Sequence, residues 1–127
     1  MPLWSRARSF FHRPPPTPTH VVRASPDGFE VRARGSGERE ASLRWDEVTR
    51  VRTYKLDLVT VDCICLLFER AGAAPVEVLE EWDGFVELME RMRERFPGIP
   101  ADWYLKVMQP AFERNETILY ERPGSAG

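Results

Sequence analysis

The sequence has no long apolar run, and this absence limits how the chain can meet a membrane. The longest uninterrupted apolar stretch, residues 63–68, has six residues, whereas a membrane-spanning helix needs about 20. Residues 1–13 mix arginines with aromatic side chains and lack the apolar segment and cleavage site of a secretory signal. We therefore expect a cytoplasmic protein, and we expect a membrane surface to be a disfavoured partner.

Histidine and cysteine are scarce, with two of each in 127 residues. Cys63 and Cys65 are two positions apart, so on a strand they share a face, and a disulfide between them would be strained. A structural zinc site needs four ligands, and only His12 and His20 could join the thiols. We therefore expect no metal, no cofactor and no catalytic residue, and we interpret both thiols as small buried side chains.

Lysine is also rare, since Lys55 and Lys106 are the only lysines among eighteen basic residues. The pI of about 5.7 argues against a nucleic-acid partner. The charge is unevenly distributed, because residues 1–55 carry a net +5 and residues 56–127 a net −7. This asymmetry predicts an acidic face if the two halves stay apart, and it cancels if they interleave in one sheet.

The length allows one domain, because two domains of half this size would each lack an adequate core. Four prolines within residues 14–18 force an extended, non-helical stretch. We therefore predict a flexible basic leader at residues 1–18, one domain at residues 19–122 and a tail at residues 123–127.

Hydrophobic periodicity predicts strands followed by helices. Apolar residues alternate with polar ones in the first half, and from Phe85 onward they recur every three or four positions. The spacing of Trp45, Val48 and Val51 breaks the alternation and predicts a bulge or one helical turn within a strand. The predicted strands cover residues 20–24, 29–34, 42–55, 61–69, 75–80 and 117–121, and the helices cover residues 83–96, with Asp83 as N-cap, and 100–110.

The order of these elements resembles a pleckstrin-homology-like roll. The kink at residues 45–51 and the apolar strand at residues 62–66 are similar to those of bacterial proteins with that fold. Residues 54–58, 80–85 and 103–117 resemble segments of a small, mostly uncharacterised bacterial family. The resemblance implies an α+β fold, in which an amphipathic helix caps a bent antiparallel sheet or partly open barrel and a second short helix lies near the C-terminus. Several relatives of this kind belong to toxin–immunity loci.

Carboxylates gather where strands end, and they supply most of the candidate site. Asp62 should share a strand face with apolar residues, so it needs a partner, for which Arg52, Tyr54 and Lys55 on the preceding strand are candidates. A cluster of Asp57, Asp62 and the acids of residues 80–83 would be a solvated rim, a protein-binding surface, or a site for catalysis or a hard cation. The predicted binding residues are Tyr54, Lys55, Asp57, Asp62, Glu80, Glu81 and Trp82.

The sequence therefore predicts a non-enzymatic module that binds another protein. An immunity role is one form of this hypothesis, since a small acidic protein can block a basic toxin domain by charge complementarity. It predicts that the double variant Glu80→Lys, Glu81→Lys folds normally and loses the partner. Two alternatives stay open: a hydrolase that uses the carboxylate cluster with a divalent cation, and a module that binds a membrane surface or lipid. The sequence leaves the oligomeric state undetermined.

Overall fold

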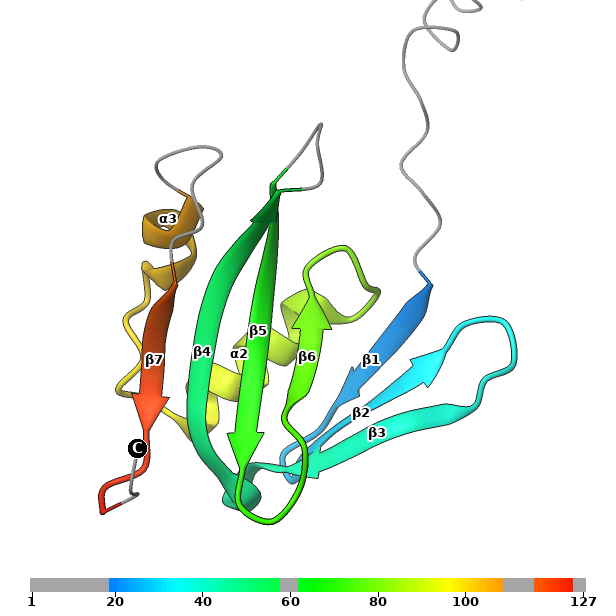
Figure 1. Cartoon of the computed structure of the whole chain (residues 1–127), viewed down its shortest axis with the longest axis horizontal. Helices are drawn as coiled ribbons and strands as arrows, with labels where there is room; N and C mark the ends of the chain where they lie inside the picture. The colour runs from blue at the N-terminus through cyan, green and yellow to red at the C-terminus, as the bar shows by residue number, and fades with distance from the viewer. Residues whose placement is uncertain (1–18, 58–61, 109–115, 125–127) are drawn as a thin grey trace, which may run out of the picture.

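The computed structural model describes residues 19–57, 62–108 and 116–124 of the chain. These ranges contain ten segments of regular structure, joined by turns and loops (Figure 1). The strands are β1 (His20–Ala24), β2 (Gly28–Ala33), β3 (Arg39–Arg44), β4 (Val48–Asp57), β5 (Asp62–Arg70), β6 (Val76–Leu79) and β7 (Thr117–Glu121). The helices are the single 3-10 turn η1 (Trp45–Glu47), α2 (Phe85–Arg95) and α3 (Trp103–Met108). The predicted leader lies outside the described residues.

The strands form two antiparallel sheets that do not close into a barrel. Sheet A has the order β1-β2-β3, and sheet B has the order β6-β5-β4-β7. The prediction of an α+β protein with one longer helix and a short second helix near the C-terminus is confirmed. The sequence predicted one continuous strand over residues 42–55, whereas the structure divides it between the two sheets.

The division occurs at η1, so the helical turn, one of the two predicted alternatives, is the one that the structure shows at residues 45–47. Trp45 anchors this corner, because its side chain is 1% exposed and its indole N–H donates to the backbone oxygen of Ser25 at 3.0 Å. The chain therefore leaves sheet A after Arg44 and enters sheet B at Val48 (Figure 1).

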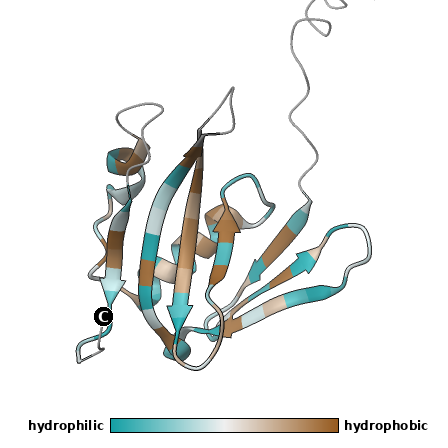
Figure 2. Cartoon of the chain, in the orientation of Figure 1, coloured by the Kyte–Doolittle hydropathy of each residue, from teal (hydrophilic) through white to brown (hydrophobic). Residues whose placement is uncertain are grey.

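The hydrophobic core lies between the inner faces of the two sheets and α2. Phe29 from sheet A packs against Trp45 and Phe68, with ring centroids 5.4 and 4.8 Å apart. Leu88 and Met92 of α2 are fully buried in the same cluster. Apolar residues therefore dominate β5, which is covered by core residues on its inner face (Figure 2).

The start of α2 differs from the prediction. Asp83 is not its N-cap; Gly84 occupies that position with φ +91°, in the left-handed region that favours glycine. The backbone oxygen of Asp83 accepts the N–H of Val22 at 2.8 Å. This bond ties the edge of sheet A to the segment that enters α2. None of the described helices is long and apolar enough to span a bilayer.

Candidate functional site

The seven predicted binding residues do not form one continuous surface. Successive residues on a strand point to opposite faces, and this separates Tyr54 from Lys55 on β4. Tyr54 lies on the outer face, where its hydroxyl donates to the carboxylate of Glu77 on β6. Lys55 lies on the inner face, is 2% exposed, and donates from Nζ to the backbone oxygen of Met108 in α3 at 3.1 Å. Lys55 therefore has a structural contact inside the protein.

Asp57 and Asp62 are paired in register at the end of β4 and the start of β5. The backbone places them side by side, as the clustering hypothesis requires, while their side chains lie outside the described part. The partners proposed for Asp62 have other contacts. Arg52 pairs with Glu69, and Tyr54 and Lys55 are engaged as given above.

Glu80 is built into the fold. One carboxylate oxygen accepts the backbone N–H of Ile64 at 2.8 Å, and the other accepts the hydroxyl of Tyr104 on α3. Burial, together with the hydrogen bond to Glu80, raises the pKa of Tyr104 to about 12. These contacts argue against the prediction that Glu80 can be reversed to lysine without harm to folding, because two donors would lose their acceptor.

Glu81 and Trp82 directly follow Glu80 in the chain, but their side chains have different surroundings from that of Glu80. Glu81 is exposed, whereas Trp82 is half-buried and stacks on the ring of His20 with centroids 4.4 Å apart. The next residue, Asp83, forms an ion pair with Arg34, which directly follows β2 of sheet A. These contacts make the segment after β6 a link between the two sheets.

His20 completes this link, and sequence reasoning missed it. Its Nε2 lies 2.7 Å from a carboxylate oxygen of Glu40, and its Nδ1 lies 2.7 Å from the hydroxyl of Thr19. The alternation of β1 could have placed His20 on the inner face, but only the tertiary structure shows that Trp82 lies there.

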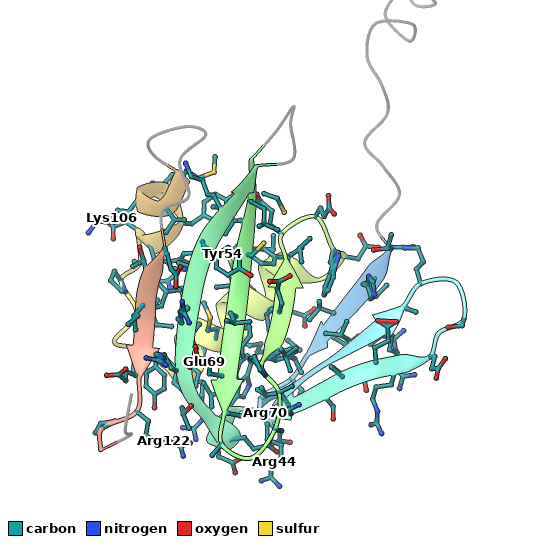
Figure 3. All side chains as sticks on the ribbon, in the orientation of Figure 1. Arg44, Tyr54, Glu69, Arg70, Lys106 and Arg122 are labelled. Atoms are coloured by element: carbon teal, nitrogen blue, oxygen red, sulfur yellow. The ribbon has the colours of Figure 1, made fainter. Side chains whose placement is uncertain are left out.

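The two oppositely charged halves of the chain interleave in sheet B, so much of the charge asymmetry cancels. Arg50 contacts Glu69 at 2.8 Å and Glu121 at 3.4 Å, and Arg52 contacts Glu69 at 3.1 Å and also pairs with Glu116. Burial raises the pKa of Glu69, but hydrogen bonds from both arginines outweigh it and hold that pKa below its ordinary value. Figure 3 labels Glu69 on the sheet that carries Tyr54.

An apolar surface lies beside this ion-pair network on the same outer face of sheet B. We call it the outer patch, and its residues are Tyr54, Leu56, Cys63, Cys65, Leu67 and Leu79. The three leucines are half-buried, and both thiols are almost fully covered. The Cys65 thiol lowers the pKa of Cys63 by hydrogen bonding to it, and the same contact with burial raises the pKa of Cys65.

Metal ligands do not converge in the described part of the chain. No group of three or more His, Cys, Asp or Glu side chains there is arranged to hold an ion. Comparison with protein families, with curated proteins and with solved structures finds no match to this chain. The resemblance to bacterial pleckstrin-homology-like proteins stays a prediction.

Proposed function

We propose that this chain is a non-enzymatic module that binds another protein through the outer patch of sheet B. The carrying observation is an apolar area on a sheet face that no described helix covers. α2 and α3 pack on the opposite side of sheet B, where Leu88 and Val107 belong to the core (Figure 1). Water reaches this patch at Leu56, Leu67 and Leu79, which are half-buried, whereas Tyr54 and both thiols are buried. Partly exposed apolar surface is a common mark of a protein-binding site.

The composition of the patch supports a protein partner over a small molecule. Leu56, Leu67 and Leu79 pack against the cluster that contains Tyr54, and interfaces characteristically place aromatic and apolar residues at their centre. Glu77 is exposed beside Leu67, its register partner, and supplies a polar rim. Of the predicted residues, Tyr54 belongs to this surface, and exposed Glu81 lies close to its edge, since its backbone contacts Cys63.

The resemblance adds two finer proposals. The first is that the two sheets and α2 form a pleckstrin-homology-like roll, supported by the antiparallel connections and the corner at η1. The second is that the partner is a toxin domain and the chain is its immunity protein. Among the side chains that the structure describes, Glu77 and Glu81 are the exposed acids beside the patch, so its apolar residues carry more of the proposed affinity than charge does.

The test compares two single-residue variants, one with a new positive charge in the patch and one with a new positive charge on another surface. Leu67→Lys puts an ammonium group in the patch, at the row whose register partners are Arg52 and Glu77, and Val86→Lys puts one on α2, where Val86 is 64% exposed. Proteins encoded beside this chain's gene are co-expressed with each variant, and complex formation is measured by affinity capture. We expect capture by the wild type and Val86→Lys and loss with Leu67→Lys. Capture that is equal in both variants would contradict the proposal, provided that both melt cooperatively.

A further inference from the structure

The outer face of sheet A gathers arginines that no sequence segment groups together. Phe29, Val31 and Leu43 face the core, so their neighbours along β2 and β3 face outward. In register across the sheet, Arg23 lies beside Glu30, and Glu30 lies beside Ser42. The outward row therefore contains one carboxylate, and the arginines of this face are Arg23, Arg32, Arg39 and Arg44.

The single carboxylate of this row does not neutralise the arginines. Arg32 donates from Nε to Glu30 at 2.7 Å and from Nη1 to the backbone oxygen of Gly37. The hydrogen bond from Arg32 lowers the pKa of Glu30 against an opposing effect of burial, and the charges of Arg32, Arg39 and Arg23 lower it further. Glu30 is thus held as an anion among three cations.

Two of the arginines keep unused donors. The side chains of Arg23 and Arg39 are exposed and make no hydrogen bond or ion pair with any residue in the described ranges. Arg44 pairs with Asp46 at 3.0 Å. On the outward row the guanidinium groups of Arg23, Arg32 and Arg39 therefore outnumber the carboxylate of Glu30, although the whole chain is acidic.

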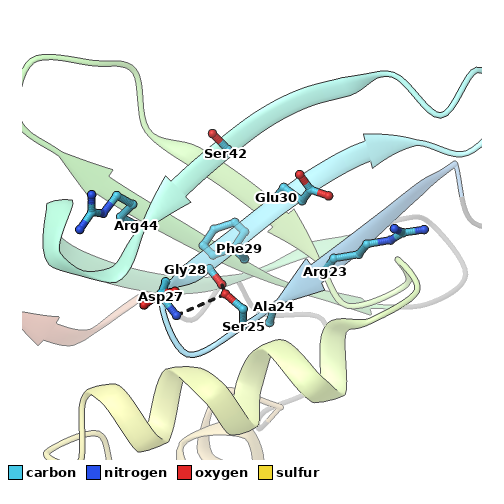
Figure 4. Close-up of a pocket in the computed structure, with 9 residues that line it drawn as sticks. All are labelled: Arg23, Ala24, Ser25, Asp27, Gly28, Phe29, Glu30, Ser42 and Arg44. Carbon is cyan, nitrogen blue, oxygen red and sulfur yellow. Dashed lines mark hydrogen bonds between the residues drawn. The ribbon is translucent and has the colours of Figure 1, made fainter.

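A depression of about 340 Å³ lies on this face, with Arg23 at one side and Arg44 at the other (Figure 4). Gly28 forms part of its floor, and a Cβ at that position would overlap the backbone of Leu43. The close approach of β2 to β3 at this point therefore requires glycine. Ser42 and two acids, Asp27 and Glu30, also line the depression.

We propose that the outer face of sheet A binds an acidic peptide segment of a partner protein. A guanidinium group matches a carboxylate in a two-pronged hydrogen bond, and Arg23 and Arg39 have the donors for it. The face is about 10 Å across three strands, which fits one extended segment and not a long polyanion. Glu30 and Asp27 on this face repel a ligand that is negatively charged along its whole surface. They favour instead a peptide whose carboxylates lie away from these two acids. This inference stands independently of the outer patch on sheet B.

The experiment compares two pairs of substitutions that remove the same charge from the full chain. Arg23→Gln with Arg39→Gln removes the unused donors, while Arg93→Gln with Arg95→Gln removes two exposed arginines from α2. Binding of a fluorescein-labelled oligoglutamate peptide is measured by anisotropy at low and at physiological salt. We expect the sheet A variant to bind roughly tenfold more weakly and the α2 variant to bind within about twofold of wild type.

Competing anions separate this proposal from its rivals. Phosphatidylserine vesicles and a single-stranded oligothymidine are titrated against the labelled peptide, and circular dichroism confirms that each variant is folded. Displacement by unlabelled oligoglutamate alone supports the proposal. An equal loss of peptide affinity in the two variants would mean that the peptide binds to positive charge in general, which contradicts the proposal. A wild-type chain that does not bind the peptide, or that prefers vesicles or DNA, would also overturn it.

Discussion

The hydroxyl of Tyr104 on α3 and the carboxylate of Glu80, directly after β6, are hydrogen-bonded to each other. The second oxygen of the same carboxylate accepts the backbone N–H of Ile64 on β5. One side chain thus joins the short second helix to sheet B. This contact makes Glu80 a structural residue, although its position in an acidic run suggests a free surface carboxylate.

Glu80→Ala should lower the free energy of unfolding by about 1–3 kcal/mol, because two partly buried donors lose their acceptor. Glu81 is the matched control, since it is exposed and adjacent, and Glu81→Ala should change stability by less than about 0.5 kcal/mol. Urea denaturation followed by tryptophan fluorescence measures both. Equal stability of the two variants would show that the Glu80 contacts contribute nothing net.

Tyr104 should make stability depend on alkaline pH. Its pKa in the folded protein is about 12, against 10.0 for an unperturbed tyrosine, so the unfolded chain releases this proton first. The contribution is fully present below pH 10.0 and is lost as pH rises towards about 12. Melting temperature should fall more steeply over this window in the wild type than in Tyr104→Phe. Parallel curves for the two proteins would refute the assignment.

Gly84→Ala should be strongly destabilising, for two reasons that add. The residue has φ +91°, and a Cβ would overlap the backbone oxygen of Val22, which belongs to the neighbouring sheet. Gly98 offers the control, because a Cβ there would meet nothing within 4 Å. We expect a loss of more than about 1 kcal/mol for Gly84→Ala and little change or a small gain for Gly98→Ala, measured by thermal melting. A neutral Gly84→Ala would contradict the close approach of β1 to the start of α2.

Glu69 should make stability depend on acidic pH. Its pKa in the folded protein is held below the ordinary value of 4.5 by Arg50 and Arg52, despite the opposing effect of burial. Its contribution is therefore present above pH 4.5 and is lost as pH falls through the lower folded value. Glu69→Gln should be less stable than wild type at pH 7 and should approach it in acid. A constant difference at all pH values would exclude this linkage.

Local patterns predicted the elements well, because strand and helix periods are written in neighbouring residues. β7 begins and ends where the sequence predicts, and α2 lies within the predicted helix. The helical turn after Arg44 also follows from the spacing of Trp45, Val48 and Val51. The prediction of Asp83 as the N-cap of α2 was wrong. The backbone of Asp83 is bound to β1, and the chain turns into the helix at Gly84.

The candidate site was predictable only in part. A strand pattern shows that Tyr54 and Lys55 face opposite sides, yet it does not show that α3 accepts a hydrogen bond from Lys55. The acids of residues 80–83 are consecutive in sequence, and the fold sends them to different partners. Glu80 meets Tyr104, while Asp83 meets Arg34.

The sequence by itself determined the α+β class, the strand and helix segments and the apolar residues of the core, since each depends on the local alternation of polar and apolar side chains. Only the tertiary structure decided which charges meet. Arg50 pairs with Glu69, 19 positions away, and with Glu121, 71 positions away. Coulomb interactions act through space and not along the chain, so acids of the second half pair with arginines of the first half, and an arginine face forms on sheet A.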